Sequence, residues 1–239
     1  VDWPDVLQGA LWSARSCITA LSNLPTRPDQ IETMMNSALL NPDVVNPSIR
    51  YGLVLRDYLL RCHPGPAARE ILLAGLSGAD AIDDPKMLGL FCSDMGRMLE
   101  SRGEFEQALL WFNKSGDIRE DLEDEAGLAA VYTNVANVRF KLGDCPGALE
   151  WYHRDREISE KMNDRHGLAT TYGNIALVHQ TMRQFDEALF WYGKTLSAQE
   201  YLGDRSGEAR TCQMIGDVHC ARGTPDRAPI AAAAVMAMT

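Results

Sequence analysis

The sequence lacks most of the features that an enzyme or a metalloprotein requires. Its six cysteines form no Cys-x-x-Cys pair, which is the spacing typical of zinc sites and dithiol redox centres. It contains no Gly-x-x-x-x-Gly-Lys phosphate-binding loop, no His-Glu-x-x-His metal motif and no Gly-x-Ser-x-Gly nucleophile turn. We therefore expect a protein without catalytic residues, metal ligands or cofactors.

Positive charge and long apolar runs are also scarce. Only 23 basic residues stand against 33 acidic ones, and the net charge of −10 disfavours nucleic-acid binding, which needs a basic face. No apolar run reaches the roughly 18 residues that span a bilayer, and no signal peptide is recognisable. We expect a cytoplasmic protein with reduced thiols and no membrane partner. A start at Val1 rather than at methionine indicates a fragment of a longer chain.

The main feature of the sequence is a repeat of 40 residues. Segments that begin at Glu125, Arg165 and Arg205 align without gaps. A repeat of this length indicates stacked supersecondary units rather than one closed core. The aligned columns hold aspartate (Asp124, Asp164, Asp204), glycine (Gly127, Gly167, Gly207), alanine (Ala108, Ala148, Ala188, Ala228), tryptophan (Trp111, Trp151, Trp191) and a second aromatic residue (Phe112, Tyr152, Tyr192).

Each repeat has the pattern of two helices joined by a tight turn. Apolar residues recur every three or four positions from Gly127 to Leu142, which predicts an amphipathic helix. Gly143 suits a left-handed helix end, and Asp144 can cap the next helix, predicted from Pro146 to Met162. Cys145 then aligns with phenylalanine in the neighbouring repeats, which indicates a structural cysteine in a turn rather than a reactive thiol.

Helix pairs with these small and aromatic columns resemble the tetratricopeptide repeat (TPR), and "GDRSGEARTCQMIGDVH" (203–219) carries the resemblance best. The longer unit is similar to repeats of the Pins/LGN polarity adaptors and of bacterial signalling ATPases and transcription regulators. The resemblance implies an all-α protein, a right-handed α-solenoid of antiparallel helix pairs. It covers units 84–123, 124–163, 164–203 and 204–223 onward. We expect two degenerate units, or alternatively an unrelated helical domain, over 1–83, and an alanine-rich tail or capping helix over 224–239.

The resemblance also implies where a ligand binds, because TPR first helices line a concave groove. Asn134 and Asn174, one repeat apart, are expected to pair with the backbone of an extended peptide, as in TPRs of the kinesin-light-chain and Pins/LGN type. Alternatively, these amides bond neighbouring helices. Thr133 and Thr170 stand where a carboxylate-clamp TPR has lysines, which argues against that ligand class. The candidate peptide-binding residues are Arg97, Thr133, Asn134, Asn137, Phe140, Lys141, Asn174, Gln180, Arg210 and Asp217.

We therefore expect a non-enzymatic interaction scaffold whose partner is a protein or an extended peptide. Two alternatives stay open. The chain could be the ligand-sensing or regulatory arm of a larger signalling ATPase or transcription regulator. It could instead self-assemble into a homo-oligomer through exposed solenoid ends, with the tail at 224–239 as the contact.

Overall fold

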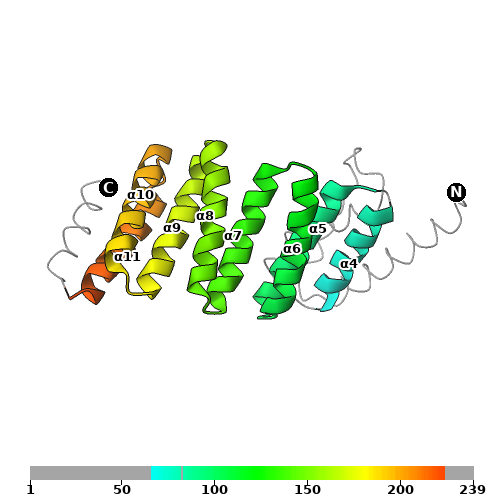
Figure 1. Ribbon diagram of the computed structural model, residues 1–239, viewed down its shortest axis with the longest axis horizontal. Coiled ribbons are helices and arrows are strands. Elements are labelled where there is room, and N and C mark those ends of the chain that lie inside the picture. The colour runs from blue at the N-terminus through cyan, green and yellow to red at the C-terminus, as the bar shows by residue number, and fades with distance from the viewer. Residues whose placement is uncertain (1–65, 82, 224–239) are drawn as a thin grey trace, which may run out of the picture. The chain divides into compact units, whose positions relative to one another are not determined.

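A computed structural model describes residues 66–81 and 83–223, and all regular structure within these ranges is α-helical. The prediction of an all-α protein is confirmed (Figure 1). The expectations for residues 1–65 and 224–239 lie outside the described residues. The helices are α4 (Pro66–Ala81), α5 (Pro85–Ser101), α6 (Phe105–Asp121), α7 (Glu125–Lys141), α8 (Cys145–Lys161), α9 (Arg165–Thr181), α10 (Phe185–Leu202) and α11 (Arg205–Ala221).

The turn between α7 and α8 follows the predicted glycine and aspartate. Gly143 has a φ of +82°, which is the left-handed region that glycine enters without steric cost. Its N–H donates to the carbonyl of Phe140 at 2.9 Å, and the N–H of Asp144 donates to the carbonyl of Arg139 at 2.9 Å. These two bonds form a Schellman motif, which satisfies carbonyls at the end of α7. The second helix begins at Cys145, one residue earlier than predicted.

The aspartates of the repeat are helix caps, and the glycine three residues later makes room for them. The Asp164 carboxylate accepts from the backbone N–H of Gly167 at 3.0 Å, and Asp204 accepts from Gly207 at 2.9 Å. A Cβ atom on Gly207 would lie 2.2 Å from the Asp204 carboxylate. The Asp-x-x-Gly signature is therefore a cap in which the aspartate folds closely over the first turn of the helix.

The described helices belong to two compact units, divided between Asp124 and Glu125. In the first unit, α5 packs against both α4 and α6. Its core contains Phe91 and Phe112, whose side chains are fully buried. Each ring lies against a glycine, because a Cβ atom on Gly75 would be 2.7 Å from Phe91 and one on Gly96 would be 2.6 Å from Phe112.

In the second unit, each of the helices α7 to α11 packs against the next one along the chain. Tyr152 of α8 shares a buried cluster with Ile175 and Val178 of the following helix, α9. Tyr192 of α10 occupies the same place against Val218 of α11. These two aromatic side chains fill the space between successive repeats.

Candidate peptide-binding surface

Asn134 on α7 and Asn174 on α9 occupy equivalent positions on two successive first helices. Both side chains are half-buried. Within the described part of the chain, neither side-chain amide has a hydrogen-bond partner. The described residues therefore give no support to the alternative, in which these amides bond to neighbouring helices. A half-buried amide without a partner can offer both a donor and an acceptor to a ligand.

Two other predicted amides are held by the tyrosines that separate the repeats. The hydroxyl of Tyr152 donates to Oδ1 of Asn137, and the hydroxyl of Tyr192 donates to Oε1 of Gln180 at 2.7 Å. Because each carbonyl oxygen accepts this bond, each NH₂ group points away as a donor. Burial, with a smaller contribution from the charge of Asp217, raises the pKa of Tyr192 to about 12. The phenol therefore remains a donor at physiological pH.

The remaining predicted residues differ in how far they are available. The Thr133 hydroxyl donates to Asp155 at 2.7 Å, so this side chain is engaged within the protein. Phe140 packs on the cluster around Tyr152. Four charged side chains are exposed, and of these Arg97 lies in the first unit and the rest in the second. These four are Arg97, Lys141, Arg210 and Asp217.

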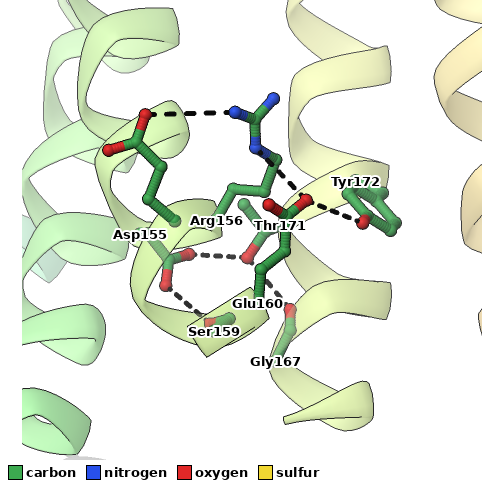
Figure 2. A network of polar contacts seen from close by, with 8 residues as sticks. Asp155, Arg156, Ser159, Glu160, Gly167, Thr171 and Tyr172 are labelled. Atoms are coloured by element: carbon green, nitrogen blue, oxygen red, sulfur yellow. Dashed lines mark hydrogen bonds and ion pairs between the residues drawn. The ribbon is translucent and has the colours of Figure 1, made fainter. Parts of the chain in front are cut away.

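A buried carboxylate, which the sequence did not predict, contacts three helices, and Figure 2 shows its bonds to Ser159 and Thr171. Asp155 of α8 is 3% exposed, and its Oδ2 accepts from Thr133 of α7 and from Thr171 of α9 at 2.6 Å. Ser159 donates to Oδ1 at 3.3 Å. Burial raises the pKa of Asp155, while the three hydroxyl groups oppose that effect. Sister repeats carry Ser115 and Thr195 at this position, which gave no signal of a carboxylate.

A surface pocket of about 420 Å³ lies where α9 ends, α10 begins and α11 ends. The predicted residue Gln180 lines it, together with Arg183 of the turn, which the sequence analysis did not select. Arg183 has a φ of +58°, whereas the equivalent turns place Gly103, Gly143 and Gly223 in this region. An arginine aligned with three glycines was the signal that could have identified it. The remaining lining residues are Leu177, Thr181, Phe185 and Ala221.

The thiols and histidines of the described residues form no recognisable chemical centre. No group of three or more His, Cys, Asp or Glu side chains there could hold a metal ion. Burial raises the pKa of Cys92 to about 11, which disfavours the nucleophilic thiolate. Cys145 packs against the cluster of Tyr152, as its alignment with phenylalanine predicted. None of the described helices combines the length and the apolar character needed to cross a bilayer.

Comparisons with known proteins identify the repeats. Residues 127–200 match the family model described as tetratricopeptide repeat. No curated protein sequence matches the chain. Among solved structures, BtubC from P. vanneervenii superposes with a TM-score of 0.72 at 17% identity, over 97% of this chain and 89% of that one. Aspartyl phosphate phosphatase F from Bacillus subtilis gives 0.73 at 14% identity, over 91% of this chain.

A third similar structure is a signal transduction ATPase with a tetratricopeptide repeat sensor, from Pyrococcus horikoshii. It has a TM-score of 0.63 and 13% identity, over 77% of this chain and 29% of that protein. The chain spans 56% of the length of phosphatase F. At these identities the likeness shows the fold, which is the α-solenoid of stacked helix pairs that the sequence predicted.

Proposed function

We propose that this chain, which contains tetratricopeptide repeats, is a non-enzymatic scaffold that binds an extended peptide segment of a partner protein along its first helices. The observation that carries the proposal is the pair Asn134 and Asn174, half-buried on successive first helices with no partner among the described residues. An extended peptide presents N–H and C=O groups at regular intervals, and a side-chain amide can pair with both. A cytoplasmic location is part of the same proposal.

The amides of Asn137 and Gln180 support this proposal because they add donors to the same helices. Their orientation is fixed before a ligand arrives, since Tyr152 and Tyr192 hold the two carbonyl oxygens. A surface that is organised in advance loses less conformational freedom when it binds. The tyrosines between the repeats would therefore also determine that the NH₂ groups of these amides, and not their oxygens, face the ligand.

The proposal is tested by replacing both asparagines. We expect Asn134→Ala combined with Asn174→Ala to weaken binding at least tenfold, because each truncation removes a bidentate contact worth about 1 kcal/mol. Twelve-residue peptides selected from a random display library on the wild-type protein serve as ligands, and isothermal titration calorimetry gives their affinities. The melting temperature should stay within about 2 °C of the wild-type value, since neither amide has a partner to lose.

Asn113→Ala is the matched control, because Asn113 is an exposed asparagine on the second helix α6. Its affinity should equal that of the wild type. Unchanged binding in the double variant would show that the ligand does not use these amides, and the proposed groove would then be wrong.

A further inference from the structure

We propose that the pocket between the ends of α9 and α11 binds a carboxylate group of the peptide ligand, with Arg183 and Gln180 as its donors. This inference rests on the proposed function and adds the chemistry of the partner. It predicts a peptide that carries an acidic side chain, or its free C-terminus, where it passes the turn between α9 and α10.

Arg183 has a left-handed backbone conformation, with a φ of +58°. Its N–H donates to the carbonyl of Gln180 at 3.0 Å, and the N–H of Gln184 donates to His179 at 2.9 Å, so Arg183 holds the position that Gly143 holds in the preceding repeat. A left-handed conformation is costly for a residue with a Cβ atom. The turns between repeats also place non-glycine residues in this region, at Asp83, Glu123 and Asn163, so what distinguishes Arg183 is that it replaces the glycine of the turns inside the repeats. Strained backbone that is retained in place of glycine points to a use for the side chain.

The side chain of Arg183 is exposed at the pocket. Within the part of the chain that the structure describes, Arg183 makes no ion pair or side-chain hydrogen bond. The nearby carboxylate of Asp186, in the first turn of α10, is instead paired with Arg222 at the end of α11. The guanidinium of Arg183 therefore lines the pocket with its charge uncompensated, and a planar guanidinium matches a carboxylate in two parallel bonds.

The other polar side chains that line the pocket are Gln180 and Thr181. Gln180 presents its NH₂ group, because its carbonyl oxygen accepts from Tyr192. The Thr181 hydroxyl donates its proton to the carbonyl of Leu177 at 2.9 Å. The free donors thus belong to Gln180 and Arg183, and together they favour an anionic acceptor. The charge of Asp217 on α11 reaches Tyr192, which bonds Gln180, so the more favourable donor for a carboxylate is Arg183 at the turn.

The apolar lining fits the stem that carries such a group. Leu177 is 37% exposed, and Phe185 is half-buried beside the turn. These two side chains can cover the methylene groups of a glutamate or aspartate, while the donors hold its oxygens. The pocket also adjoins the predicted binding face, since its lining residue Leu177 follows Asn174 by three positions and so lies on the same side of α9.

The test uses the full chain and the peptides selected on it. Each of the best binders is synthesised in three forms: as selected, with its acidic residues replaced by their amides, and with its C-terminus amidated. Calorimetry then measures the three forms against wild type, Arg183→Gly, Arg183→Asn and the Asn134/Asn174 double variant. Glycine and asparagine both tolerate the left-handed conformation, so neither variant disturbs the turn.

We expect the selected peptides to share an acidic group and to bind about tenfold more weakly to either Arg183 variant. The form that lacks the critical carboxylate should bind about tenfold more weakly to the wild type and should be insensitive to Arg183. This comparison shows whether the group is a side chain or the C-terminus. Arg183→Gly should also raise the melting temperature by about 2–4 °C, because it relieves the strained turn.

The outcomes separate this inference from the function on which it rests. Peptides that depend on Asn134 and Asn174, but neither on Arg183 nor on a carboxylate, would overturn the inference and leave the proposed function standing. A wild-type protein that selects no peptide would overturn both. A lower melting temperature for Arg183→Gly would contradict the argument from backbone strain.

Discussion

Replacing Tyr152 with alanine is expected to lower the free energy of unfolding by about 3–5 kcal/mol, as is usual for a large buried aromatic side chain. Tyr152 is 2% exposed and packs against Ile175 and Val178. Its ring lies between α7, α8 and α9, so truncation opens a cavity at the contact between two successive repeats. Ala136 and Ala148 line the same cluster and are too small to fill it.

The loss should also change the form of the unfolding transition. In a solenoid each repeat depends on its neighbours, so weakening one contact reduces the coupling between the helices on either side. Urea unfolding followed by circular dichroism should show a lower midpoint and a broader transition. Tryptophan fluorescence should respond at the same urea concentration or lower, because Trp151 and Trp191 both pack on this cluster.

Tyr152→Phe is the matched control, since it keeps the ring and removes only the hydroxyl that donates to Asn137. We expect a loss of about 1 kcal/mol or less, because one hydrogen bond to a half-buried amide is removed. If the alanine and phenylalanine variants unfolded at the same urea concentration, the ring would not stabilise the contact between repeats as its place in the buried cluster indicates.

The elements that sequence analysis predicted are those fixed by local backbone requirements. Gly143 marks a left-handed turn because few other residues adopt that conformation freely. The Asp-x-x-Gly signature at Asp164 and Gly167 marks a helix start because cap and glycine contact each other. Because the sequence repeats every 40 residues, the same signals recur at equivalent positions in several repeats.

The features that were missed depend on contacts between helices. The bond from Tyr192 to Gln180 joins α10 to α9, and no spacing in the sequence specifies which groove amide a tyrosine hydroxyl will reach. Asp155 was missed because its partners Thr133 and Thr171 come from two different helices. Arg183 was missed because the repeats were compared for the residues that they share, whereas Arg183 differs from the glycine of the equivalent turns.

Stability is expected to change with pH because the carboxylate of Asp155 is buried at the contact of α7, α8 and α9. Burial raises the folded-state pKa of Asp155 above its ordinary value of 3.8, and the charge of Asp164 acts in the same direction. The folded protein therefore binds this proton more readily than the unfolded chain. As pH rises from 3.8 through the raised pKa, this group's contribution to stability falls, and above that range it is constant.

The helix-capping aspartates change stability with pH in the opposite direction. Their contribution must therefore be separated from that of Asp155. The amide of Gly147 and the guanidinium of Arg139 lower the pKa of Asp144, and the amide of Gly207 lowers that of Asp204. Their stabilisation is present at neutral pH and is lost as pH falls through the lowered values. The wild-type pH profile is the sum of both trends, so only its difference from a variant at position 155 isolates the buried group.

Asp155→Asn is expected to remove the fall in stability that Asp155 causes as pH rises. It should change stability at pH 7 by less than about 1 kcal/mol, because the amide oxygen can still accept from both threonines and its NH₂ can donate to Ser159. Asp155→Ala should cost about 2–3 kcal/mol at pH 7, since Thr133 and Ser159 lose their acceptor, although Thr171 can still donate to the carbonyl of Gly167. Urea unfolding at half-unit steps from pH 4 to pH 8 measures both. Parallel wild-type and asparagine profiles would mean that Asp155 titrates as an ordinary exposed carboxyl. The buried hydroxyl cluster that joins the three helices would then have to be reassigned.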